Sequence, residues 1–227
     1  FFSLLFLSFD PIMGIYKEVG RKSLDEIVKM ALFEKATPQA VAQMWLHHHD
    51  YAIQYVGKVL SRAAYSALSP RLQQNPFFVI PVFRDKGLFN VIVNNHRDLS
   101  IVSPLGEYQK QGDLVQPHMT MQFFTELQKS KGLVLMRSEI KDKVLTRQDA
   151  YHITTTFLRY YTYPHCFAFV EEFNKNSNQF DFHRYLRHMK EDAKQWSTQK
   201  SLHHIDILDK TFTWSDRPGK IDTPGTD

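Results

Sequence analysis

The sequence predicts an α+β fold with a helical N-terminal part, a mostly antiparallel β-sheet of about five strands covered by helices, and a C-terminal helix followed by an extended tail. Three observations lead to this prediction. Helix-capping motifs and helical spacing dominate the first seventy residues. Apolar runs, several with the alternation of a half-exposed strand, fill residues 77–140. A capped helical pattern then resumes at Thr146. Helices, then strands, then helices is the order of an α+β domain.

Three helices are expected in the N-terminal part. The capping-box pattern Ser23-Leu24-Asp25-Glu26 opens a short first helix. Thr37-Pro38 begins the second, because threonine is a good cap and proline is tolerated at the first helical position; it should run to about Tyr55. The third covers about Ser61–Leu72 and stops before Pro76.

Five strands are predicted, at residues 77–83, 88–94, 99–102, 117–124 and 133–139. Pro81 removes a backbone donor from the first of them, so an edge strand or a bulge is expected there. Arg84-Asp85-Lys86-Gly87 has the length of a hairpin turn. In the fourth strand Met119, Met121 and Phe123 share one face, which should point inward.

The segment Leu133–Met136 is an unbroken apolar run, which favours a strand covered on both faces. A helix follows it: Thr146 and Asp149 have capping-box spacing, and apolar residues recur at helical intervals as far as Tyr161. Beyond it, Phe167–Val170 suggests a further strand or an apolar loop, and a final helix is expected from Phe182 to about Trp196.

The chain divides into an apolar extension over residues 1–21, an α+β domain over 22–189, and the end of the last helix with a polar tail over 190–227. The apolar start is about half the ~20 residues that a transmembrane helix needs and has no leading positive charges. No transmembrane helix is therefore predicted, although this Phe/Leu segment leaves contact with a membrane surface open. Because the chain starts at Phe1 rather than Met, a processed or partial chain is expected.

Charge and cysteine content exclude two classes of protein. The net charge is +4, but the basic residues are interleaved with acids, as in Lys190-Glu191-Asp192-Ala193-Lys194, so no nucleic-acid-binding stripe is expected. A single cysteine, Cys166, excludes an internal disulfide and hence a disulfide-stabilised secreted scaffold. Its neighbour His165 invites comparison with a Cys/His nucleophile, but neighbours in an extended segment point in opposite directions.

No catalytic, cofactor or metal motif is visible. The glycines have neither phosphate-binding nor dinucleotide-binding spacing. His47, His48 and His49 are consecutive, and on a helix their side chains would diverge by ~100° per residue. Glu139, at the end of the covered strand, is expected to be a structural or interface acid. We therefore expect a non-enzymatic protein without cofactor or metal, whose role is binding or assembly. An enzyme using Cys166 or Glu139 would lose activity as Cys166→Ser or Glu139→Gln with its fold intact.

Several spaced segments form a recognisable pattern across the chain. They are Leu24-Asp25-x-Ile27-x-x-Met30, Trp45-x-x-His48, Tyr65, Arg71, Pro76-Phe77, Glu126-Leu127, Lys131-Gly132-Leu133-Val134-Leu135-Met136, Glu139, Leu145, Ala150, Ile153, Tyr161, Phe169-Val170-Glu171-Glu172-Phe173-Asn174 and Phe180. Together these segments resemble the mitochondrial assembly factors of the F-type ATP synthase catalytic head, the family that chaperones the beta subunit. The resemblance spans roughly Lys22 to Met189, and its most specific part is the strand Lys131–Met136 combined with a Val-Glu-x-Phe-Asn-like segment downstream.

This resemblance implies a protein of the mitochondrial matrix that holds the free beta subunit until an alpha subunit replaces it. Such a task calls for a broad, partly apolar surface rather than a cleft. The predicted partner-binding residues are Phe167, Phe169, Glu172, Phe173, Trp45, Phe1, Phe2 and Phe6. Core packing is the alternative role for Trp45 and for the phenylalanines around Val170.

A second hypothesis is a permanent accessory subunit of the ATP synthase, or of another large mitochondrial complex, that reuses the chaperone fold. Its two extensions would then be anchored on neighbouring subunits. Presence at a fixed ratio in mature ATP synthase would support the subunit, and association only with free beta subunit would support the chaperone.

Overall fold

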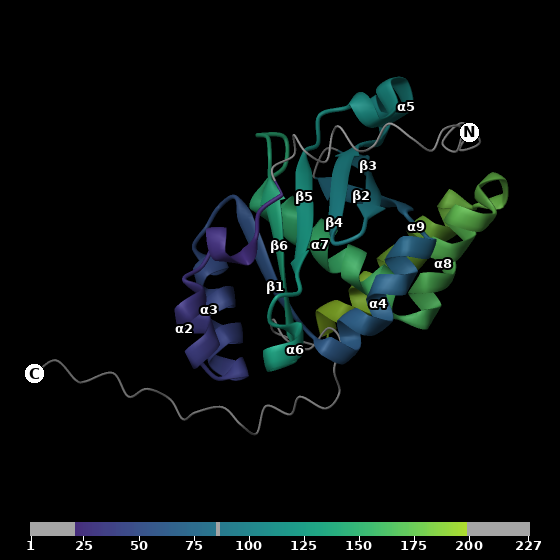
Figure 1. Cartoon of the computed structure of the whole chain (residues 1–227). Helices are drawn as coiled ribbons and strands as arrows, with labels where there is room; N and C mark the ends of the chain where they lie inside the picture. Colours follow the sequence, from purple (N-terminus) through teal and green to yellow (C-terminus); the bar gives the residue numbers. More distant parts are fainter. Residues whose placement is uncertain (1–20, 85–86, 199–227) are drawn as a thin grey trace, which may run out of the picture.

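The computed structural model describes residues 21–84 and 87–198, and within them the fold is α+β (Figure 1). Its centre is a six-stranded, wholly antiparallel sheet in the order β1-β6-β5-β4-β3-β2. Phe1, Phe2 and Phe6 lie outside the described residues, as does the polar tail after Thr198.

The strands are β1 (Tyr55–Ser61), β2 (Phe77–Arg84), β3 (Gly87–His96), β4 (Leu99–Pro104), β5 (Met119–Phe124) and β6 (Leu133–Ile140). The α-helices are α2 (Met30–Lys35), α3 (Pro38–Asp50), α4 (Arg62–Gln74), α5 (Leu105–Gln111), α6 (Gln128–Lys131), α7 (Arg147–Thr162), α8 (Pro164–Lys175) and α9 (Phe182–Thr198). Short 3-10 helices are η1 (Leu24–Glu26), η2 (Gly112–Leu114) and η3 (Ser177–Gln179).

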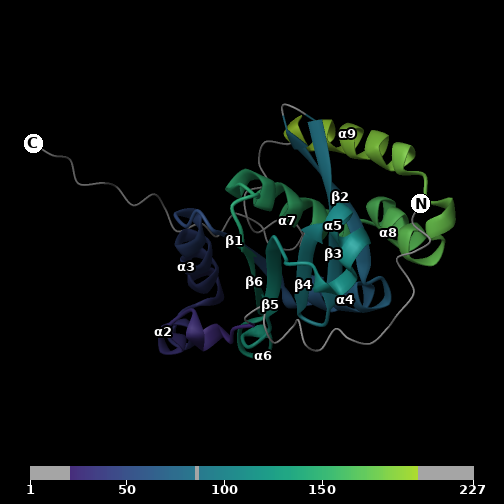
Figure 2. The ribbon, with the colours of Figure 1, turned by 90° about the horizontal axis from the view of Figure 1, so that it is seen from above.

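Helices cover the sheet on both faces (Figures 1 and 2). The N-terminal helices α2 and α3 lie against β1 and β6, while α4, α7, α8 and α9 lie on the other face. Alternation along β6 serves both sides, because Leu133 and Leu135 pack in the core under α3 and Val134 and Met136 in the core under α7. The prediction of a strand buried on both faces is confirmed, since every residue from Leu133 to Ser138 is buried.

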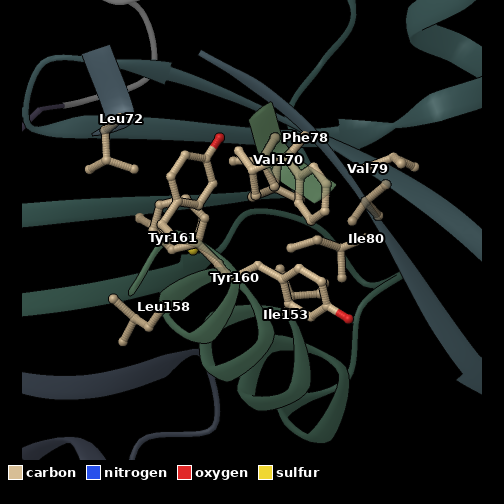
Figure 3. Close-up of a cluster of buried hydrophobic side chains, with 14 of the residues drawn as sticks. Leu72, Phe78, Val79, Ile80, Ile153, Leu158, Tyr160, Tyr161 and Val170 are labelled. Carbon is tan, nitrogen blue, oxygen red and sulfur yellow. The ribbon is translucent and has the colours of Figure 1, made fainter. Parts of the chain in front are cut away.

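The larger core lies between the sheet and the helices α4, α7, α8 and α9 (Figure 3). Phe78 of β2 contacts a ring of aromatic neighbours, with centroid distances of 5.4 Å to Tyr160 and 5.9 Å to Phe173. The hydroxyl of Tyr161 donates to the carbonyl oxygen of Asn75 at 2.7 Å, which satisfies the polar end of a fully buried ring. The high aromatic content of the chain therefore serves this core to a large extent.

The sheet has one strand more than the five predicted. The second N-terminal helix ends at Asp50 rather than near Tyr55, and β1 follows it. Gly57 and Lys58 obscure the alternation of this strand, which forms because its whole length pairs with the distant β6, from Tyr55↔Glu139 to Ser61↔Leu133. Gly57 is needed there, since a Cβ at this position would lie 2.8 Å from the His49 ring.

The segment predicted as a strand or loop around Phe167–Val170 is helical and belongs to α8. Pro164 occupies the start of this helix, where its missing N–H costs nothing. Cys166, Val170 and Phe173 recur at helical spacing and are all buried. The continuous apolar letters concealed this spacing, because short apolar runs do not distinguish helix from strand.

Other local predictions are confirmed. Pro81 lies in an edge strand, β2, which pairs with β3 through a hairpin in which Arg84 opposes Gly87. Thr146 and Asp149 form the expected capping box at the start of α7. Ser61, expected at the start of the third helix, is the cap of α4, where its side chain accepts from the N–H of Ala64.

Candidate partner-binding surface

Trp45 lies in the core beneath α3. Its side chain is fully buried, its indole N–H donates to the carbonyl oxygen of Met136 at 3.1 Å, and its ring contacts Phe124. This placement fits the alternative given for Trp45, a core anchor that fixes α3 on β6. A role for Trp45 in partner binding stays a prediction.

The four predicted residues of α8 differ in their surroundings. Phe173 is fully buried against Phe78, whereas Phe167 and Phe169 are partly buried at the rim of the core. The Arg71 guanidinium lies 4.4 Å from the centroid of the Phe167 ring, and Glu172 forms an ion pair with Arg184 of α9. Within the described chain these side chains join α8 to its neighbours: Phe167 meets α4, whereas Phe169 and Glu172 meet α9.

A second apolar surface lies at the end of the sheet that carries α5 (Figure 1). The strands β1, β3 and β5 begin at this end, and β2, β4 and β6 finish there, as the antiparallel register requires. Of the nine exposed large apolar side chains among the described residues, seven belong to segments at or next to this end. We call them the sheet-end surface: Tyr51, Ile53, Phe83, Leu88, Leu114, Val144 and Tyr151.

Three apolar side chains of the sheet-end surface are almost fully exposed to solvent. Leu114, Tyr51 and Ile53 are 80%, 79% and 78% exposed. Scattered single apolar residues are normal on a surface, but several gathered over one region often mark an interaction site. This surface could not be predicted from the sequence, because its members come from four regions that are far apart along the chain and no local pattern joins them.

Two arginines hold the segments of the sheet-end surface in place. Arg84, at the end of β2, donates to the carbonyl oxygen of Val144 at 2.6 Å and to the carboxylate of Asp149 at 2.7 Å. Arg147 donates to the carbonyl oxygen of His49 at 3.2 Å and so ties the start of α7 to the end of α3. The end of β2, the start of α7 and the end of α3 are therefore fixed to one another, which lowers the entropic cost of binding a partner over this part of the surface.

Electrostatics at this end stabilise the start of α7. Burial alone would raise the pKa of Asp149, but hydrogen bonds from Arg84 and Thr146 outweigh it and hold that pKa below its usual range. Glu139 pairs with Arg137 at 3.2 Å and with Lys141 at 2.9 Å, which fits the first of the two roles expected of it, structural or interface acid. Lys58 lies nearby on β1 with its ammonium 4.2 Å from the centroid of the Tyr151 ring. Burial lowers the pKa of Lys58 to about 8.

Groups for cofactor chemistry are few in the part of the chain that the structure describes. His165, Cys166 and His188 come together between α8 and α9. His165 and Cys166 are consecutive on a helix, not on the extended segment expected, and the first is exposed while the second is buried. Over the described residues, no helix is both long and apolar enough to cross a membrane.

Comparison with known proteins identifies the family. The family model described as ATP11 protein matches residues 16–186, three quarters of the chain. The chain belongs to the ATP11 protein family. This is the assembly-factor family that its motifs resemble, and the matched residues contain every element from η1 to α8.

One curated relative of the ATP11 family is the mitochondrial protein atp11 of the fission yeast Schizosaccharomyces pombe. It is 22% identical over 186 residues, which cover 76% of this chain. The same alignment covers 64% of the yeast protein, so this chain spans less than two thirds of its relative.

Proposed function

We propose that this member of the ATP11 family is a non-enzymatic chaperone of the mitochondrial matrix. It binds the free beta subunit of the F-type ATP synthase and releases it when the alpha subunit docks. An unassembled beta subunit exposes large apolar interfaces and tends to aggregate. Covering such an interface requires a partner surface on the order of 800 Å² per side rather than a catalytic cleft.

The sheet-end surface is the observation that carries this proposal. Its exposed apolar and aromatic residues suit the centre of an interface, and tyrosine is favoured in such positions. The contacts of Arg84 and Arg147 hold the part of this surface formed by β2, the start of α7 and the end of α3 in one arrangement before the partner arrives. The predicted residues Phe167, Phe169 and Glu172 offer an alternative contact surface on α8, and the test below separates the two.

The direct test is an aggregation assay with purified beta subunit. Light scattering of the beta subunit on dilution from denaturant is followed with and without the wild-type chain at equal concentration. Wild type is expected to suppress most of the scattering. The double variant Ile53→Asp/Leu114→Asp should lose most of this suppression, because it places charges in a surface that must be desolvated.

Two further variants make the assay specific. Leu32→Asp alters an exposed leucine of α2 outside the sheet-end surface and should suppress scattering like wild type. Phe167→Ala/Phe169→Ala tests the surface on α8. Loss in the α8 variant with full activity in Ile53→Asp/Leu114→Asp would move the interface to α8, and absence of suppression by wild type would refute the chaperone. Circular dichroism checks that each variant is folded.

Stoichiometry in native mitochondria separates the chaperone from a permanent accessory subunit. The chaperone is expected with free beta subunit and absent from purified mature ATP synthase. A fixed ratio to the other subunits in the mature enzyme would overturn the proposal in favour of the resident subunit.

A further inference from the structure

Three metal-binding side chains from two helices meet on the side of the molecule opposite α2 and α3. His165 and Cys166 lie at the start of α8 and His188 lies in α9. One donor atom from each lies within 4.8 Å of the other two. We propose that these residues bind a zinc ion that joins α8 to α9.

The donor set selects the class of cation. Two imidazole nitrogens and one thiolate are typical ligands of Zn²⁺, whereas Mg²⁺ and Ca²⁺ prefer oxygen. Around a tetrahedral zinc ion the donor atoms would stand ~3.3–3.7 Å apart, given Zn–N of about 2.0 Å and Zn–S of about 2.3 Å. Since the donor atoms lie within 4.8 Å of one another, each pair needs to approach by about 1.5 Å or less. Since His165 is exposed, its ring has room to make this adjustment.

The surroundings hold the two inner ligands in position. The Tyr160 hydroxyl is 2.9 Å from Nδ1 of His188, and the Phe169 ring packs against the same imidazole with centroids 4.7 Å apart. Metal-binding histidines are commonly oriented in this way by a hydrogen bond at the other ring nitrogen. Cys166 is fully buried in the core beside α7, so its sulfur faces a medium of low dielectric in which attraction to a cation is strong.

Binding is a simple exchange at sulfur. The S–H bond of Cys166 breaks, a sulfur–zinc bond forms, and the proton passes to solvent. Three protein ligands leave the fourth tetrahedral position to a water molecule. With ligands from both helices, the ion would hold the start of α8 against α9 and add to the contact that the Glu172–Arg184 ion pair already provides.

The test uses the full chain freed of metal by a chelator and titrated with Co²⁺ and Zn²⁺. Cobalt is expected to bind one ion per chain and to show the near-ultraviolet charge-transfer band of a thiolate ligand together with tetrahedral visible bands. At a hundredfold excess over Kd, zinc should raise Tm by roughly 5–10 °C.

Variants assign the ion to these residues. His165→Gln is exposed and should fold normally but lose at least tenfold in cobalt affinity. Cys166→Ser should abolish the charge-transfer band. His183→Gln, an exposed histidine of α9 outside the group, and His48→Gln, in the histidine run of α3, are the matched controls and should bind like wild type.

Three results would overturn the proposal. The first is a wild-type chain with no cobalt band and no zinc-dependent rise in Tm. The second is unchanged binding in His165→Gln. The third is loss of binding in His48→Gln, which would place the ion on α3. Each is independent of the aggregation assay, so the zinc site and the chaperone function stand or fall separately.

Discussion

At some positions of this protein, the residue type is determined by a close neighbour rather than by backbone conformation. Gly57 is an example: it has an ordinary strand pairing, opposite Arg137, and its role is to leave space for the His49 ring. That ring is buried, and its Nδ1 is 2.7 Å from the carbonyl oxygen of Trp45. A glycine inside a strand often marks such a close approach, but the sequence does not say which group approaches.

Gly57→Ala is therefore expected to destabilise the fold. A Cβ at this position would lie 2.8 Å from Cγ of His49, so β1 or α3 has to shift, at a cost of about 1–3 kcal/mol. Urea denaturation measures the change. Gly106→Ala in α5 is the control, because nothing lies within 4 Å of its added Cβ, and it should be neutral or slightly stabilising. Equal effects in the two variants would contradict the role given to Gly57.

His49 also predicts how stability depends on pH. Burial lowers its pKa to about 4, whereas the unfolded chain has the ordinary value of about 6.5. Between these values the unfolded state binds the proton more readily, so stability falls as the pH drops from about 6.5 toward 4, by up to about 3 kcal/mol. Chemical denaturation across this range should reveal the fall. His49→Gln should flatten it and His48→Gln should preserve it.

Among the secondary-structure elements, helix starts and the edge strand could be predicted from the sequence, but the pairing of distant strands could not. Thr146 with Asp149 fixed the start of α7, and Pro81 correctly placed β2 at an edge, because both act within a few residues. The strand β1 and the helix α8 were misassigned. The strand β1 depends on β6, its partner far along the chain, whereas the helical spacing of α8 was concealed within a short apolar run. The sheet-end surface was not predicted either, because its residues lie in distant parts of the chain that only the pairing of the strands brings to one end of the sheet.

The start of α7 offers a test at this scale. The Asp149 carboxylate accepts hydrogen bonds from Arg84 and from the backbone N–H of Thr146. Asp149→Asn removes its negative charge and should lower the free energy of unfolding by about 1–3 kcal/mol near neutral pH. Because the pKa of Asp149 is lowered in the folded chain, its stabilisation is present above its ordinary pKa and is lost as the pH falls through the folded value. Thermal unfolding of wild type and variant should therefore converge in strong acid. A constant difference at every pH would contradict the ion pair.

For the whole molecule, the fold class and the family could be predicted from the sequence, but the sheet-end surface could not. The order of elements gave the α+β class, and the motif around Lys131–Met136 pointed to the family that the comparison identifies. The partner surface was sought among clustered phenylalanines, since aromatic clusters are common at interfaces. In the folded chain Phe173 and Trp45 are buried in the two cores, and their role in partner binding stays a prediction. The exposed apolar residues of the sheet-end surface share no sequence motif.

Leu135→Asp tests whether β6 belongs to the core or to an interface. Leu135 is fully buried between β1 and β5 and faces the core under α3. An unpaired carboxylate at this position should lower the free energy of unfolding by more than about 4 kcal/mol and so unfold the domain. Circular dichroism and protease resistance measure this, with Leu32→Asp as the exposed control. A folded Leu135→Asp protein that lost only its partner would place the interface on β6.

The strand order also governs when the sheet can be completed. The first strand, β1, pairs only with β6, the last strand to be reached along the chain, while β2 to β6 form a meander of sequential neighbours. The meander needs short loops, whereas joining β1 to β6 closes a long loop and is slow. Until then the apolar residues of β1 and the free edge of β6 are open to other chains. A protein proposed to protect an aggregation-prone subunit thus passes through an aggregation-prone stage of its own.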